Sequence, residues 1–246
     1  MAKFFVNPED VSEEFILIKG TDVNHIKNVL RLGIGKEILI NDRQGNDYEC
    51  IIKDISAESV TAQIINYKES HTEPEVETVL FQSLVKGEKM EFVIQKSVEI
   101  GVTKIVPLVT KRCVVKLESE SKLNNKIARW QKIAEGAAKQ SKRGIVPEVM
   151  MPMTMCEALA YVKEELDCGC IPYENETAYH IKTYLQSLRA QSIGIFIGPE
   201  GGFTEEEVAL AMEHKVQSIT LGKRILRSET AGLVTLANIM YEMGER

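Results

Sequence analysis

The sequence predicts an α/β protein in which a small β-rich domain precedes a parallel sheet covered by helices. Two patterns predict this. From about residue 78 onward, short apolar runs alternate with segments of helical periodicity, which is typical of parallel βαβ units. In roughly the first seventy residues the apolar runs are short, β-branched and separated by turn residues, which favours a small barrel.

The N-terminal part is expected to contain four strands and one short helix. The strands lie at residues 15–18, 37–40, 47–52 and 59–65, and the helix at 23–32. Turn residues at 33–35, 42–46 and 56–59 separate them. The polar stretch 67–77 contains Pro74 and several charges, so we place a domain boundary within it. This gives a first domain over 1–72 and a second over 73–246.

The second part is expected to alternate between the two kinds of element. Strands are predicted at 79–85, 105–109, 168–173, 193–197 and 216–221, and helices at 88–100, 123–142, 154–166, 205–212 and 230–243. Gly101 is a predicted C-cap, and the pairs Thr154–Glu157 and Thr204–Glu207 form predicted capping boxes. The loops that follow the strands should meet at the carboxyl edge of the sheet, where open α/β sheets bind ligands.

Composition is that of an ordinary globular protein, with 44% hydrophobic and 27% charged residues in 246. The first residues lack an apolar signal core, and no apolar run reaches the length of a membrane span, so we expect a cytoplasmic protein without a membrane partner. Five cysteines at irregular spacing do not suggest a disulfide framework. Cys168 and Cys170 have no second Cys/His pair beside them, so we interpret them as buried thiols and expect no metal.

Charge is distributed unevenly along the chain. The net charge of −6 argues against a general nucleic-acid binder. Residues 121–147 nevertheless carry seven basic side chains and one acidic side chain, Glu135, which gives a local charge of 7 − 1 = +6. Two interpretations stay open: a solvated helix face, or a surface whose repulsion a polyanion neutralises.

The segment Gly198-Pro-Glu-Gly-Gly202 follows a predicted strand and opens a helix. Pro199 removes a backbone donor, while Gly201 and Gly202 allow a ligand to approach the backbone closely. The segment lacks the Lys-Ser/Thr ending of a phosphate loop and does not match Gly-x-Gly-x-x-Gly. Three carboxylates at 205–207 would repel a phosphate, so this loop favours a cofactor that lacks phosphate or carries positive charge.

A second loop, Lys223-Arg-Ile-Leu-Arg-Ser-Glu-Thr-Ala231, follows the last predicted strand. Ile225 and Leu226 lie between two arginines, which suggests backbone wrapped over a flat apolar ligand such as a purine. Arg227 has two interpretations, an internal ion pair with Glu229 or a contact to a phosphate or planar anion.

Together these loops strongly resemble those of the bacterial ribosomal RNA uridine-N3 methyltransferases (RsmE family) of the SPOUT superfamily. The resemblance extends to His25-x-x-x-Val-Leu-Arg31, Lys86-Gly-Glu-Lys-Met-Glu91 and Arg129-Trp130, and thus to nearly the whole chain. Ser228 and Gly136, often Thr and Ala in such proteins, are conservative departures.

The resemblance implies a PUA-like RNA-binding barrel followed by a SPOUT α/β trefoil knot with a mainly parallel sheet, although connection rules alone predict an unknotted sheet. It implies a homodimer that uses S-adenosyl-L-methionine to methylate N3 of a specific uridine in 16S ribosomal RNA, with the small ribosomal subunit as partner. The implied cofactor-binding residues are Ile171, Pro172, Glu174, Gly198, Pro199, Glu200, Gly201, Gly202, Leu221, Gly222, Ile225, Leu226 and Thr230.

Methylation of uracil N3 also suggests roles for charged residues. The imide is a poor nucleophile until its proton leaves, and arginine donors suit the resulting anion. We therefore expect Arg227 to stabilise that anion and Glu229 to orient Arg227 or help accept the proton, whereas His25 lies in the barrel and is not expected to act. The expected RNA-binding residues are Arg31, Lys96, Arg129, Lys139 and Arg143.

Two other functions compete with this one. A SPOUT methyltransferase could act on a ribose 2′-hydroxyl or on transfer RNA. A non-catalytic ribosome-binding factor could keep the fold as an RNA clamp, although such a protein would have no need of the intact loop at 198–202.

Overall fold

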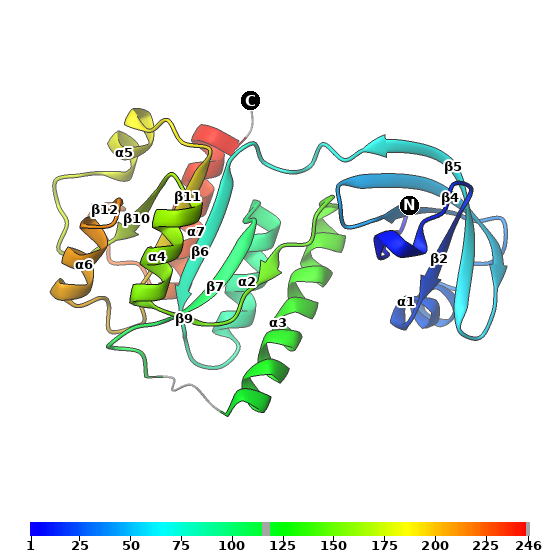
Figure 1. Ribbon diagram of the computed structural model, residues 1–246, viewed down its shortest axis with the longest axis horizontal. Coiled ribbons are helices and arrows are strands. Elements are labelled where there is room, and N and C mark those ends of the chain that lie inside the picture. Colours follow the sequence, from blue (N-terminus) through cyan, green and yellow to red (C-terminus); the bar gives the residue numbers. More distant parts are fainter. Residues whose placement is uncertain (115–118, 245–246) are drawn as a thin grey trace. The chain divides into compact units, whose positions relative to one another are not determined.

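The computed structural model describes residues 1–114 and 119–244, which form two compact units (Figure 1). The first unit contains Met1–Glu73 together with Ala138–Val146, and the second contains the rest of the described chain.

The first unit is built around a five-stranded sheet in the order β1-β3-β4-β5-β2. Only β1 and β3 pair in parallel, and the other neighbours are antiparallel. The strands are β1 (Lys3–Phe5), β2 (Phe15–Lys19), β3 (Glu37–Asn41), β4 (Asn46–Ile55) and β5 (Ser59–Glu69), and short turns of helix lie between them at η1 (Pro8–Asp10), α1 (Thr21–Asn24) and η2 (His25–Val29).

The alternating side chains of these strands explain the core of the first unit. Ile16 and Ile18 on β2 are fully buried together with Ile38 and Ile40 on β3, because residues two apart in a strand point to the same face. The four strands predicted at 15–65 are all present, and the structure extends β4 and β5 by several residues. The three-residue strand β1 was not predicted, because so short a run carries no periodicity.

The second unit is built around a seven-stranded parallel sheet in the order β12-β10-β11-β6-β7-β8, with β9 also pairing with β7. The strands are β6 (Glu77–Ser83), β7 (Lys104–Val109), β8 (Glu148–Val149), β9 (Met153–Thr154), β10 (Cys168–Pro172), β11 (Ser192–Ile197) and β12 (Val216–Ile219). This confirms the predicted α/β architecture with a mainly parallel sheet. The trefoil knot stays a prediction.

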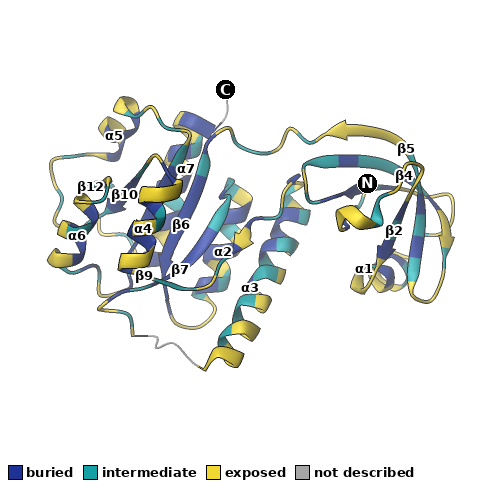
Figure 2. Ribbon diagram, in the orientation of Figure 1, coloured by how far each residue is buried: buried dark blue, intermediate teal, exposed yellow. Residues whose placement is uncertain are grey.

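Helices cover both faces of this sheet. They are α2 (Lys89–Ile100), α3 (Glu120–Ser141), α4 (Met155–Glu165), α5 (Ile181–Ser187), α6 (Glu205–Met212) and α7 (Ser228–Ile239), followed by the turn η3 (Met240–Gly244). Phe81 and Phe196 stack on the face that α4 and α6 cover. Leu80 and Ile197, one residue away and therefore on the opposite face, lie close to Gly232 of α7. The longer strands of the sheet, β6, β7, β10, β11 and β12, are accordingly buried over most of their residues (Figure 2).

Local sequence signals fix several helix ends. Both predicted capping boxes form, with Thr154 and Thr204 accepting from the backbone N–H of Glu157 and Glu207, and α6 begins and ends at the predicted residues. Gly101 ends α2 in the left-handed region, at φ 119°. None of the helices in the described chain combines the length and the low polarity that a membrane span requires.

Other ends differ from the prediction. The strand β12 stops at Ile219, two residues early, and α7 begins at Ser228, two residues early. The short elements α5, β8 and β9 were not predicted. The loop between β12 and α7 therefore runs from Thr220 to Arg227, where the extended backbone of Arg227 caps the helix.

Candidate functional site

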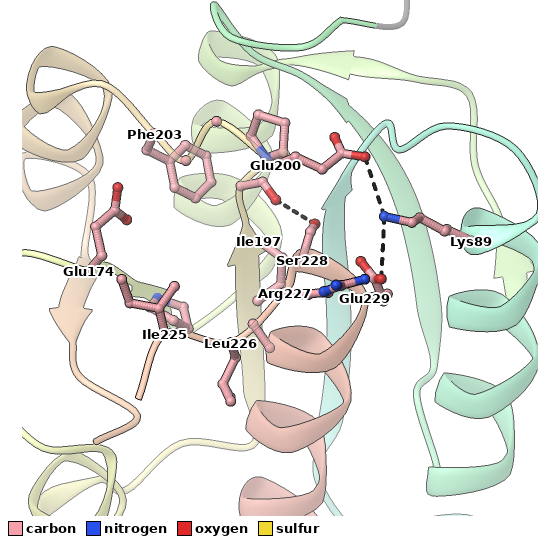
Figure 3. Close-up of a pocket in the computed structure, with 16 residues that line it drawn as sticks. Lys89, Glu174, Ile197, Glu200, Phe203, Ile225, Leu226, Arg227, Ser228 and Glu229 are labelled. Atoms are coloured by element: carbon pink, nitrogen blue, oxygen red, sulfur yellow. Dashed lines mark hydrogen bonds and ion pairs between the residues drawn. The ribbon is translucent and has the colours of Figure 1, made fainter. Parts of the chain in front are cut away.

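A pocket of about 550 Å³ lies at the carboxyl edge of the parallel sheet (Figure 3). Its walls come from four places in the chain: the start of α2, the end of β10, the loop after β11, and the end of the loop after β12 together with the start of α7. The lining residues are Lys89, Pro172, Glu174, Ile197, Gly198, Pro199, Glu200, Gly201, Gly202, Phe203, Ile225, Leu226, Arg227, Ser228, Glu229 and Ala231. We call this cavity the main pocket.

A second pocket of about 510 Å³ shares walls with the main pocket. Pro172, Glu174, Ile225, Leu226 and Ala231 line both cavities. The second pocket adds the loop after β10 and the loop after β12, including Leu221 and Gly222. The two loops singled out in the sequence and the loop after β10 therefore surround one hollow region of the sheet edge.

Most of the expected cofactor residues line these two pockets. Ile171 and Thr230 do not. Ile171 is fully buried in β10, one residue before Pro172, so its side chain belongs to the core of the sheet. Thr230 is exposed on the first turn of α7. The cofactor-binding roles themselves stay predictions.

Hydrogen bonds hold the loop after β11 in a fixed shape. The N–H of Gly202 donates to the carbonyl oxygen of Pro199 at 2.9 Å, and Gly202 has φ 68°, which favours glycine. A Cβ at Gly202 would lie 2.5 Å from Oε1 of Glu174. Arg112 donates through Nη1 to the carbonyl oxygens of Gly201 at 2.9 Å and Phe203 at 3.1 Å. Sequence reasoning missed Arg112, which lies 89 residues from Gly201.

Ser228 connects the two main loops of the pocket. Its hydroxyl donates to the carbonyl oxygen of Gly198 at 2.5 Å and accepts from Nε2 of Gln82 at 2.9 Å. These three residues come from the end of β6, the loop after β11 and the first turn of α7. The buried hydroxyl thus fixes the distance between the two loops.

Lys89 brings two carboxylates together at one wall of the main pocket. Its Nζ lies 3.4 Å from Glu229 and 3.7 Å from Glu200, and Figure 3 shows both pairs. Burial raises the pKa of the Glu229 carboxyl, but its own backbone N–H, Lys89 and the charge of Arg227 outweigh that effect. The pKa of Glu229 is therefore below its ordinary value. Sequence reasoning missed Lys89, because its partners lie far along the chain.

Arg227 has an exposed side chain that lines the main pocket. Within the described residues its guanidinium makes no ion pair within 4 Å, and Glu229 pairs with Lys89 instead. Of the two interpretations left open, the internal ion pair is therefore not the one that forms. The fork of donors is available to a bound group.

Ile225 exposes 88% of its surface although it lines both pockets, and Leu226 is half-buried. The apolar character of this pair is therefore not explained by packing in the protein core. An exposed apolar side chain at the rim of a cavity offers contact area to a ligand or a partner.

The expected RNA-binding residues are divided between the two units, with Arg31, Lys139 and Arg143 in the first and Lys96 and Arg129 in the second. Arg31 and Arg129 are exposed, Lys96 pairs with Glu99 at 2.8 Å and Lys139 pairs with Asp22 at 3.0 Å. Arg143 is only 4% exposed and its guanidinium contacts Glu73 within the first unit. This burial favours a structural role, and the RNA-binding role of Arg143 stays a prediction.

Two family models match the chain. Residues 72–240 match the model described as an RNA methyltransferase domain, and residues 18–65 match the RNA methyltransferase PUA domain. The first match covers most of the second unit, including both pockets. The second covers most of the five-stranded sheet.

Similar proteins extend over almost the full chain. The Ribosomal RNA small subunit methyltransferase E of Bacillus subtilis is 34% identical, over 92% of this chain and 89% of its own length. The protein of the same name from Mesomycoplasma hyopneumoniae is 35% identical, over 98% of this chain and 100% of its own length. A crystal structure of the Neisseria gonorrhoeae protein of that name, bound to S-adenosyl methionine, has a TM-score of 0.86 at 32% identity and covers 99% of this chain and 98% of its own.

Proposed function

This chain belongs to the ribosomal RNA small subunit methyltransferase E family, and from that premise we propose that it methylates 16S ribosomal RNA with S-adenosylmethionine. The finer proposal is that the acceptor is N3 of a uridine, the uracil(1498)-N3 methyltransferase activity. The observation that carries the proposal is the main pocket, where loops from four parts of the chain meet at the carboxyl edge of a parallel sheet.

The residues of the pocket fit the proposed methyl donor, which supplies an electrophilic methyl group on a positively charged sulfur. Ile225, Leu226 and Pro172 offer apolar walls for an adenine ring. Glu174 and Glu200 add carboxylates to the lining, which suits a donor that carries positive charge. The glycines at 201 and 202 let the backbone of this loop pack closely against Arg112 and Glu174, which keeps the loop at the pocket wall.

Arg227 is the residue that we propose acts on the base. Removing the N3 proton leaves a negative charge that spreads over two carbonyl oxygens, and a guanidinium fork in a partly enclosed pocket can stabilise it. Glu229 supports this as a positioning residue through its charge: Lys89 holds the carboxylate without an ion pair to Arg227, and the charge of Arg227 contributes to the lowered pKa of Glu229. A carboxylate with a lowered pKa is a weak base, which favours orientation over proton acceptance.

We also propose a cytoplasmic homodimer that acts on the small ribosomal subunit. The exposed apolar surface of Ile225 at the pocket rim supports a partner surface close to the cofactor site. The PUA domain supports RNA binding by the first unit.

The deciding experiment is methylation with labelled S-adenosylmethionine, comparing isolated small subunits with free 16S ribosomal RNA, followed by mass spectrometry of nuclease digests. We expect label on one uridine, on the base at N3. Label on a ribose 2′-hydroxyl, or on transfer RNA, would contradict methylation at uridine N3 and favour the alternative SPOUT activity on a ribose or on transfer RNA. A protein that binds the cofactor in calorimetry but labels no ribosomal RNA would contradict the proposal itself.

A further inference from the structure

A third pocket, of about 440 Å³, lies within the second unit between the connection from β6 to α2 and the helix α3. We call it the side pocket. It is lined by Leu84, Val85, Lys86, Gly87, Glu88, Glu91, Lys126, Arg129 and Trp130. None of these residues lines the main or the second pocket, and only Arg129 was among the RNA-binding residues expected from the sequence.

Three basic side chains meet at the side pocket. Lys86 is exposed and makes no ion pair with any residue that the structure describes. Arg129 contacts Glu91 through Nη2 at 2.7 Å, and its side chain is 66% exposed, which leaves other donors of the fork toward solvent. Lys126 lies with its Nζ 5.5 Å from the ring centre of Trp130. The lining also holds two acidic residues, Glu88 and Glu91, so its basic side chains outnumber its acidic ones by three to two.

Trp130 explains why one of these charges has a defined position. The indole is the single tryptophan of the chain and is only 3% exposed, so packing fixes its ring. An ammonium over a tryptophan ring is attracted by the ring electrons, and this attraction holds Lys126 beside the cavity. Lysines on a solvated helix face would not need an aromatic ring to hold them in one position. The side pocket therefore has the chemistry of an anion site with at least one cation held in place.

The side pocket and the main pocket share a segment of chain. Residues 84–88 line the side pocket, and the next residue, Lys89, lines the main pocket and contacts Glu229. Gly87 turns this segment at φ 65°. An anion held by Lys86 would thus be fixed relative to the wall of the cavity in which the proposed reaction occurs.

We propose that the side pocket binds a backbone phosphate of the ribosomal RNA next to the target uridine, and that this contact sets the register of the strand. Phosphate contacts position a nucleic acid without reading its sequence, and here the position would decide which base reaches the main pocket. This inference rests on the proposed function, since it presumes that the main pocket receives a base of that RNA. It gives Lys86, Lys126 and Arg129 a role in substrate binding.

The test compares Lys86→Ala with Lys132→Ala in the full-length protein. Both changes remove one lysine charge, but Lys132 is exposed on α3 and does not line the side pocket. Methylation of small subunits is measured with KM and kcat separated, affinity for a fragment of the RNA is measured over a salt series, and cofactor affinity is measured by calorimetry. A second variant, Arg129→Gln, repeats the comparison at the opposite wall of the pocket.

For Lys86→Ala we expect KM for the small subunit to rise about tenfold with cofactor affinity unchanged, as for one lost charged contact. The slope of log affinity against log salt should become less steep by about 0.7, the value for one phosphate of a single strand. Lys132→Ala should keep the wild-type KM. If the wild type methylates the small subunit, and Lys86→Ala and Lys132→Ala have the same KM and the same salt slope, the inference is overturned. If the wild type itself does not methylate the small subunit, the proposed function is contradicted instead.

Discussion

The hydroxyl of Ser228 donates a 2.5 Å hydrogen bond to the carbonyl oxygen of Gly198. It also accepts from Nε2 of Gln82. Ser228→Ala removes both contacts from a buried position, so we expect a loss of about 1–3 kcal/mol in unfolding free energy and a weaker cofactor affinity. Denaturant unfolding and calorimetry measure the two effects. Ser228→Thr keeps the hydroxyl and should restore the affinity; if Ser228→Ala binds the cofactor as the wild type does, the connection between the loops is irrelevant to binding.

Arg227→Ala should nearly abolish methylation while leaving cofactor affinity within a few-fold. The guanidinium makes no ion pair within the described chain, so its removal should leave the fold intact. Arg227→Lys keeps the charge but not the fork, and should recover only part of the activity. Initial rates with saturating cofactor and calorimetry on the same samples separate the two effects. Turnover like that of the wild type in Arg227→Ala would exclude the proposed role.

Glu229→Gln tests whether this carboxyl positions Arg227 or accepts the proton. Its pKa is lowered from the ordinary 4.5, so it is ionised at neutral pH. Because the folded protein favours the ionised carboxylate, this group contributes its full stabilisation at pH values above the ordinary pKa. The contribution is lost as the pH falls through the lowered pKa of the folded state. The difference in unfolding free energy between wild type and variant should therefore be largest above about pH 4.5 and shrink at lower pH. Denaturant titrations at several pH values measure it.

The same variant has an expected kinetic signature. Since Glu229 does not titrate between about pH 6 and 9, Glu229→Gln should lower kcat without changing the shape of the pH–rate profile over that range. An acidic limb, on which the wild-type rate falls as the pH drops and which disappears in Glu229→Gln, would identify this carboxyl as the proton acceptor.

Gly201→Ala tests how closely a ligand approaches the loop after β11. A Cβ at Gly201 meets Arg112 at 3.4 Å, an ordinary contact, and the residue does not need a positive φ. We therefore expect a melting temperature close to that of the wild type and a cofactor affinity lowered at least tenfold. Gly202→Ala is the comparison, because its Cβ would lie 2.5 Å from Glu174 and its φ of 68° strains any other residue. That variant should lose stability as well. Unchanged cofactor affinity in Gly201→Ala would show that no ligand group approaches this glycine.

Arg143→Ala should act on stability rather than on RNA contact. The guanidinium is buried and contacts Glu73, so the change removes the charged partner of a carboxylate that keeps the backbone N–H groups of Gly144 and Ile145 as donors, at a cost of about 1–3 kcal/mol. Thermal unfolding should show the loss. Below the unfolding transition, the salt dependence of RNA affinity should match that of the wild type. A less steep salt dependence would restore Arg143 to the RNA-binding residues.

Signals that lie within a few residues of one another were readable from the sequence. The capping box of Thr204 and Glu207 fixed both the start of α6 and the shape of the adjoining loop, because its two hydrogen bonds are local. Apolar periodicity located the main strands of both sheets for the same reason. The strand β1 escaped prediction, because three residues do not complete a pattern.

Contacts between distant residues were not readable in this way. Lys89 and Arg112 look like ordinary surface cations in the sequence, and only the fold places them beside Glu229 and Gly201. Arg143 shows the opposite case. Its place in a basic segment suggested an RNA contact, but its guanidinium is buried and hydrogen-bonded to the carboxylate of Glu73, 70 residues away. Charge counts describe a segment, whereas the partner of each charge depends on tertiary structure.

The walls of the main pocket also constrain how the protein reaches its active form. Lys89 and Ala231, which both line the cavity, are separated by 231 − 89 = 142 residues. A chain that is still being synthesised, and has not yet made α7, lacks one wall of the cavity and the hydroxyl that joins its loops. Cofactor capture must therefore follow the docking of α7, and long-range closure of this kind is slow compared with the formation of single helices. Binding of the methyl donor should then report that folding of the second unit is complete.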